Sequence, residues 1–97
     1  MNERLLQADR LLIVGLIDQA GRIYREVLSA EPGNSQALVG LANCEVEQGN
    51  LLAGYDVALR ALEVDRTNTV ALRMEARLSE ILAARGEPVR RPAWITR

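Results

Sequence analysis

Several residue types are missing from the chain or nearly so. Its 97 residues include no histidine, no phenylalanine and no lysine, and only one cysteine. Without histidine the chain lacks the commonest general base and metal ligand, which excludes Ser–His and Cys–His nucleophile pairs. The single cysteine, Cys44, cannot close an internal disulfide, so a disulfide-stapled scaffold is excluded as well. We therefore expect no enzyme, no cofactor and no metal site.

Aromatic side chains are also scarce, and neither sign of charge is in large excess. Tyr24, Tyr55 and Trp94 are the aromatics, 3% of the chain, and leave little surface on which bases could stack. The formal net charge is −1, and all twelve basic residues are arginines. Residues 73–97 form a basic end, but it is too sparse to indicate nucleic-acid binding. We expect no nucleic-acid partner.

No apolar run is long enough for a membrane span. The longest one, Leu11 to Ile17, has seven residues, and Asp18 ends it, whereas a span needs roughly 20. No small-residue cleavage site follows that run. We expect a cytoplasmic protein that does not enter a membrane.

What the sequence does contain is helical periodicity. Apolar residues recur at the i, i+3, i+4, i+7 spacing of an amphipathic helix, and no stretch alternates long enough for a strand. Turn-forming residues separate the periodic pieces, which predicts an all-α fold of five antiparallel helices near 2–14, 18–30, 35–48, 52–64 and 69–85. One stripe is Ala20, Ile23, Tyr24, Val27 and Leu28, and a later one is Ala71, Met74, Leu78, Ile81 and Leu82.

The pieces repeat at a fixed interval. A shift of 34 residues superimposes Gly15 on Gly49, Asn34 on Asn68, and Ala8 on Ala42 and Ala76. A 34-residue unit of two helices resembles the tetratricopeptide repeat. The first unit fits the family pattern with Ala8, Leu11, Gly15, Ala20, Tyr24 and Pro32, and the second with Leu38, Leu41, Ala42, Gly49, Gly54 and Ala61.

The resemblance implies a short helical solenoid. Its domain covers residues 1–86, with one repeat over 1–34, a second over 35–68 and a capping helix over 69–86. Residues 87–97 form an extended basic tail. Departures from the pattern include Arg4 in place of a large apolar residue and Ala58 in the place equivalent to Tyr24. Because alanine is smaller than tyrosine, Tyr55 is expected to fill the space that the smaller Ala58 side chain leaves.

The resemblance also implies a binding surface, because the first helix of each repeat lines a concave groove. The 34-residue shift aligns three rows of equivalent residues on the first helices of successive units. The helix predicted over 69–85 contributes Arg73 and Arg77, which lie one turn apart. We expect the groove to bind a peptide or helix of a protein partner, with an acidic group of the partner at the two arginines. The alternative is that the charged residues are solvated and that Leu5 and Leu12 pack on a neighbouring helix. The predicted groove residues are Leu5, Asp9, Leu12, Val39, Asn43, Val46, Arg73 and Arg77.

The tail carries the apolar pair Trp94 and Ile95 in a segment that two prolines keep from forming a long helix. We interpret the pair as a docking site, because an exposed tryptophan is unfavourable unless something covers it. The alternative is a frayed terminus.

These features predict a non-catalytic adaptor or scaffold. Two alternatives remain: a small chaperone that shields an aggregation-prone secretion or assembly subunit, and a self-associating structural unit. Two repeats and a cap fall short of the three or more that usually form a continuous core. We therefore expect a homo-oligomer, at least a dimer, or an obligate complex.

Overall fold

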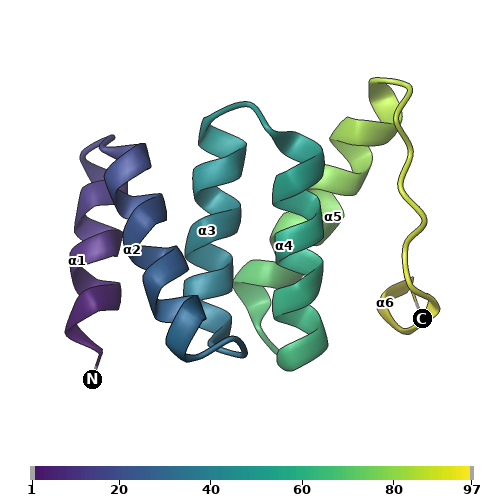
Figure 1. Ribbon diagram of the computed structural model, residues 1–97. Helices are drawn as coiled ribbons and strands as arrows, with labels where there is room; N and C mark the ends of the chain where they lie inside the picture. Colours follow the sequence, from purple (N-terminus) through teal and green to yellow (C-terminus); the bar gives the residue numbers. More distant parts are fainter. Residues whose placement is uncertain (1, 97) are drawn as a thin grey trace.

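Five long helices and a one-turn sixth follow one another along the chain in the structure, a computed structural model that describes residues 2–96. Met1 and Arg97, where the predicted first repeat begins and the predicted tail ends, lie outside the described residues. The helices are α1 (Glu3–Ile13), α2 (Ile17–Ala30), α3 (Ser35–Glu47), α4 (Leu51–Val64), α5 (Thr69–Ala84) and α6 (Ala93–Thr96). Helices α1 to α4 stand side by side in chain order, α5 passes obliquely behind α4, and the tail descends at the right of the view (Figure 1).

The predicted helices are confirmed. Each of the five long helices begins and ends within one residue of its predicted bounds, and no strand occurs among the described residues. The one addition is α6, a four-residue turn in the otherwise extended tail. Each of the five long helices packs against the next, and α1 also contacts α3, so the first helices of the two repeats are neighbours.

Glycine ends the first helix of each unit. Gly15, Gly49 and Gly86 have φ values of 87°, 82° and 78°, in the left-handed region that a side chain disfavours. At the first of these turns the amide of Leu16 donates to the carbonyl of Leu11 over 2.9 Å. This is the Schellman arrangement, in which the glycine lets the chain turn back and satisfy a free helix carbonyl.

Asparagine begins the first helix of each unit. The side chain of Asn34 accepts a hydrogen bond from the amide of Ala37 at 3.0 Å, and Asn68 accepts one from Ala71 at 3.1 Å. Each bond satisfies one of the free amides of a helix N-terminus. The N-caps are thus Asn34 and Asn68, and the hydroxyl residues that follow them, Ser35 and Thr69, are the first residues of the helices.

Small residues lie where the helices cross. The alanines at these crossings have no exposed surface, which lets the helix axes approach closely. Larger side chains fill the gaps between crossings, and Tyr24 and Tyr55 are the largest of them. Tyr55 is only 2% exposed, as expected from its proposed role. The fully buried alanines are Ala8, Ala20, Ala37, Ala42, Ala58, Ala61 and Ala71.

The inner face of α5 differs in part from the predicted stripe. Ala71, Leu78 and Leu82 are buried as expected, but Met74 and Ile81 are only half-buried. A charged residue, Glu75, has no exposed surface at all. Within residues 2–96 no helix is both long enough and apolar enough to cross a membrane.

Candidate partner-binding groove

Two adjoining hollows run along α1, α3 and α5. The hollow between α3 and α5 has a volume of about 370 Å³, and the one between α1 and α3 about 340 Å³. Asn43 and Val70 line both, so the two hollows form one continuous surface, which we call the groove. The groove contains Asp9, Leu12, Val39, Asn43, Val46, Arg73 and Arg77.

Leu5 is the predicted groove residue that the structure places elsewhere. Its side chain is 6% exposed and packs in the core cluster of α1 and α2 with Ala8 and Tyr24. Leu12 is partly buried against the same cluster while it also lines the groove. The position of Leu5 therefore follows the alternative interpretation, in which it packs on a neighbouring helix.

The hollow between α3 and α5 is apolar at its base and positive at its rim. Half-buried aliphatic residues line it, among them Val46, Met74 and Ile81. Arg73 and Arg77 are exposed, and neither makes an ion pair or hydrogen bond with another described residue. Of the described carboxylates, Glu47 alone lines this hollow. Such a site can bind an apolar side chain together with a carboxylate.

Sequence reasoning missed the aliphatic part of this hollow. Met74 and Ile81 belong to the apolar stripe of the last helix, and that stripe indicated a core face. Val70 precedes the stripe and is more than half exposed. In the structure these side chains line the hollow between α3 and α5 and stay partly open to solvent.

The hollow between α1 and α3 combines aliphatic side chains with several polar ones, among them Asp9 and Tyr24. The hydroxyl of Tyr24 donates a hydrogen bond to Oδ1 of Asp9. Burial raises the pKa of Tyr24, and the hydrogen bond and the charge of Asp9 raise it further. The phenol therefore stays protonated at neutral pH, and its hydrogen bond holds Asp9 in the hollow that Gln36 and Asn43 also line.

The tail lies on the other side of α5 from the groove. Trp94 and Ile95 are half-buried and pack against the cluster of Leu38, Ala61, Leu62 and Ala71. The guanidinium carbon of Arg66 lies 4.1 Å from the centroid of the Trp94 ring, a cation–π contact.

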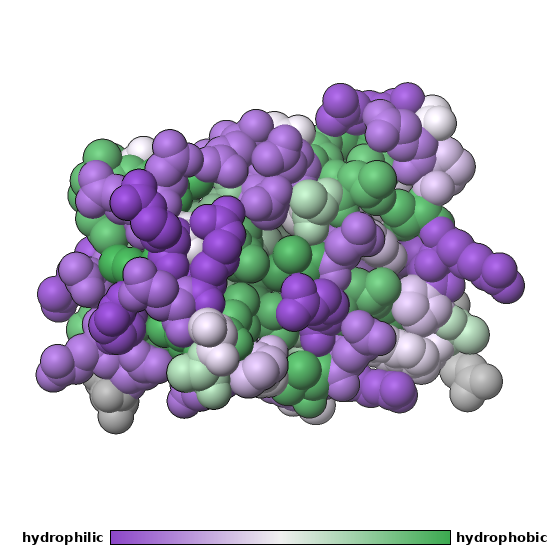
Figure 2. All heavy atoms as spheres, viewed as in Figure 1, coloured by the Kyte–Doolittle hydropathy of each residue, from purple (hydrophilic) through white to green (hydrophobic). Residues whose placement is uncertain are grey.

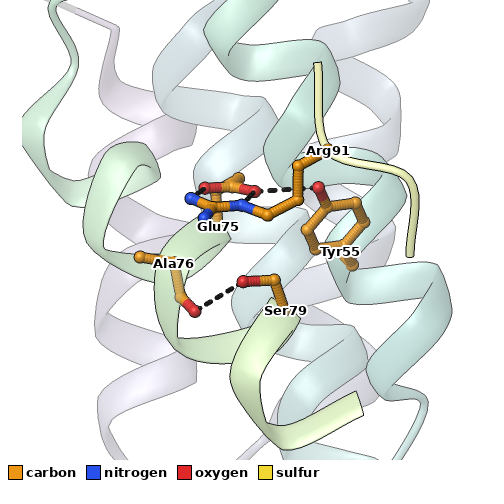
Figure 3. A network of polar contacts seen from close by, with 5 residues as sticks. All are labelled: Tyr55, Glu75, Ala76, Ser79 and Arg91. Carbon is orange, nitrogen blue, oxygen red and sulfur yellow. Dashed lines mark hydrogen bonds and ion pairs between the residues drawn. The ribbon is translucent and has the colours of Figure 1, made fainter. Parts of the chain in front are cut away.

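A buried carboxylate fixes the tail (Figure 3). Nε of Arg91 donates to Oε2 of Glu75 at 2.7 Å, and an amino group of Arg91 donates to Oε1 at 2.6 Å. The hydroxyl of Tyr55 donates to Oε2 of the same carboxylate at 2.8 Å. Burial raises the pKa of Glu75, but the bonds from Arg91 and Tyr55 and the charge of Arg91 outweigh it, and the net pKa lies below its usual value.

The described residues hold no cluster of three or more potential metal ligands among histidine, cysteine, aspartate and glutamate. Cys44 is buried, and burial raises the pKa of its thiol, so it is a poor nucleophile at neutral pH. What the arrangement offers chemically is a shaped, charged surface.

The family match agrees with this geometry. The tetratricopeptide repeat family matches residues 11–78, more than half of the chain, and the chain belongs to that family. Repeats of this family generally mediate protein–protein interactions. The chain is also similar to cellulose synthase 1 operon protein C of Komagataeibacter xylinus, with 44% identity over 46 residues, which are 47% of this chain and 4% of that relative. No solved structure matches the chain.

Proposed function

We propose that the chain is a non-catalytic adaptor whose groove binds an acidic segment of a partner protein. The observation that carries the proposal is the position of Arg73 and Arg77, two cations one turn apart at the rim of a partly apolar hollow, with no ion-pair partner within residues 2–96. A solvated pair of arginines needs no such hollow beside it, whereas a peptide ligand uses both.

Each part of the groove has a role in this proposal. A carboxylate of the partner, from a side chain or a C-terminus, accepts hydrogen bonds from the two guanidinium groups. An apolar side chain of the partner enters the hollow at Val46 and Met74. Asn43 lies between the two hollows, and its amide can donate to and accept from the backbone of an extended ligand.

A site-specific photo-crosslink tests the location. A benzophenone amino acid replaces Val39, which is half-buried in the groove, and in a second protein it replaces Ala53, which is exposed on α4. On illumination in host cells, the groove variant is expected to crosslink to a partner that the α4 variant does not reach. Equal crosslinking from both positions, or crosslinks from Ala53 alone, would contradict a groove interface.

Self-association is a second candidate, favoured by one surface feature. Ile13 and Val14 are 83% and 68% exposed at the turn between α1 and α2, and Leu16 lies beside them at 45%. Figure 2 shows this apolar patch at the end of the molecule where α1 meets α2. A second copy could cover the patch. The double variant Ile13→Asp and Val14→Asp should then sediment as a smaller species than the parent, and an unchanged sedimentation coefficient contradicts this candidate.

The chaperone alternative uses the same groove and differs in the partner. Co-expression with affinity purification from the native host distinguishes the adaptor, the chaperone and the self-associating unit. A large multiprotein assembly favours the adaptor, one small tightly bound partner favours the chaperone, and recovery of the chain alone favours self-association.

A further inference from the structure

The tail occupies the place of a missing helix. The 34-residue shift that relates α2 to α4 relates α4 to the segment that begins at residue 85, directly after α5. In this register a third repeat would place its second helix against α4 and α5. The structure instead has an extended segment there, and its Val89 and Trp94 pack on the core clusters of α4 and α5.

The tail is fixed by polar and ring contacts at two points, and the link before them is held only by the apolar packing of Val89. Arg91 binds the buried carboxylate of Glu75, and Trp94 lies under Arg66. Between the turn at Gly86 and Arg91, none of Pro88, Val89 and Arg90 makes a hydrogen bond or ion pair with another described residue. The contacts at the two points would be the same whether the tail came from this chain or from another copy of it.

The buried carboxylate of Glu75 restricts which segments can bind to the face of α4 and α5 that the tail covers. Glu75 has no exposed surface, and its partners are Tyr55 and Arg91. An unpaired carboxylate in such a position is strongly unfavourable, so the face requires an occupant with a cation. A planar guanidinium satisfies both oxygens at once, which an ammonium group cannot do. An occupant also needs a ring three positions after the arginine to reach Arg66.

We propose that the face of α4 and α5 is a second peptide-binding site, separate from the groove, and that it takes a segment with an arginine and, three residues later, an aromatic residue. The chain's own tail fills this site in an isolated molecule. The occupant in trans is the tail of a second copy, so two chains can exchange tails. The proposal does not depend on the function proposed for the groove.

The experiment uses the chain's single tryptophan. The full chain with Arg91→Ala and Trp94→Ala has an empty site and no tryptophan, so all tryptophan emission in a titration comes from an added synthetic peptide of residues 86–97. We expect a saturable blue shift of that emission. The unaltered chain should bind the peptide at least about tenfold more weakly, measured by the anisotropy of a dye on the peptide, because its own tail competes at a high effective concentration.

Two matched peptides and a second variant make the test decisive. The peptide with Arg91→Ala should bind at least about tenfold more weakly, since it leaves Glu75 unpaired, and the peptide with Arg90→Ala should bind like the parent peptide. If the double variant loses its helical circular dichroism, the single variant Trp94→Ala is titrated instead. Absence of a blue shift with a folded variant, or equal binding by the Arg91→Ala peptide, would overturn the proposal.

Exchange between copies has its own test. Deletion of residues 88–90 shortens the reach of the tail by about 10 Å, so the tail can dock only on another copy. This variant is expected to sediment as a dimer or larger species, and a variant with three glycines at 88–90 should sediment like the parent. A deletion variant that sediments like the parent overturns exchange between copies.

Discussion

The ring of Tyr24 lies directly against Gly40. A Cβ atom at position 40 would overlap three ring carbons of the tyrosine, so α3 needs a glycine where the side chain from α2 crosses it. Tyr24 has no exposed surface and reaches past Gly40 to the carboxylate of Asp9 in the groove. One glycine thus allows both the contact of two helices and the position of a polar group in the candidate site.

The variant Gly40→Ala tests this contact. The added methyl group must displace a buried ring, so we expect the free energy of unfolding to fall by about 1–3 kcal/mol, despite the better helix propensity of alanine. Urea unfolding measures it. Gly21→Ala is the matched control: its Cβ meets only the side chain of Arg25, at 3.5 Å or more. That variant should be unchanged or up to about 1 kcal/mol more stable, and equal effects of the two variants would contradict the contact.

Ala42 tests the close helix crossing of the second repeat. It is fully buried, and a Cβ at Gly54 of α4 would lie 3.3 Å from its carbonyl oxygen. Ala42→Leu should lower the free energy of unfolding by about 1–3 kcal/mol, because the larger side chain has no space. Ala53→Leu, at an exposed position of α4, should change it by less than about 0.5 kcal/mol. If thermal melts show that Ala42→Leu has the same melting temperature as the parent, the repeat register is contradicted.

Asn68 tests the helix caps. Its side chain caps α5, whereas Asn50, at the start of α4, makes no such bond. Replacing Asn68 with alanine should lower the free energy of unfolding by about 1 kcal/mol. Asn50→Ala should stay within about 0.5 kcal/mol of the parent. Equal losses from the two variants would show that the cap of α5 contributes nothing specific.

The repeat architecture could be read from the sequence because it is periodic and local. Glycines at 15 and 49 and asparagines at 34 and 68 mark the same points of successive units, and each acts through its own turn or cap. The tail network could not be read in this way. Glu75 has the sequence appearance of a solvated helix residue, and its partner Arg91 comes from a segment without periodicity. Only the three-dimensional course of the chain after Gly86 joins them.

The same limit applies to the groove. The 34-residue shift identified the residues of α1, α3 and α5 that share a face, but it could not say how far each one faces the groove. Leu5 turns into the core, while Met74 and Ile81 stay partly open. Those differences depend on how neighbouring helices rotate against each other, which the 34-residue spacing does not determine.

The pair of Glu75 and Arg91 predicts a pH-dependent effect on stability. The folded-state pKa of Glu75 lies below its ordinary value of 4.5, so its contribution to stability is present above that pH and is lost as the pH falls further. In the variant Arg91→Ala the effect of burial dominates, and the pKa of Glu75 should rise above the unfolded value. Deprotonation of Glu75 then destabilises the variant as the pH rises.

We therefore expect Arg91→Ala to lower the free energy of unfolding by about 1–3 kcal/mol at pH 7, less than for a fully buried pair because Arg91 is 35% exposed. The difference from the parent should shrink towards pH 3. Denaturant unfolding across this pH range measures it. Arg90→Ala is the control, since Arg90 is exposed and has no partner among the described residues. A difference that does not change with pH would contradict the role given to Glu75.

The most direct test of the proposed groove is a calorimetric titration of a captured partner with the double variant Arg73→Glu and Arg77→Glu. We expect the affinity to fall at least about tenfold, because the charge at the rim of the hollow reverses, with unchanged helical circular dichroism. The control variant Arg22→Glu and Arg60→Glu makes the same change in net charge at exposed positions of α2 and α4, and it should bind like the parent. Parental affinity in the groove variant, or an equal loss in both variants, would contradict recognition of an acidic segment by Arg73 and Arg77.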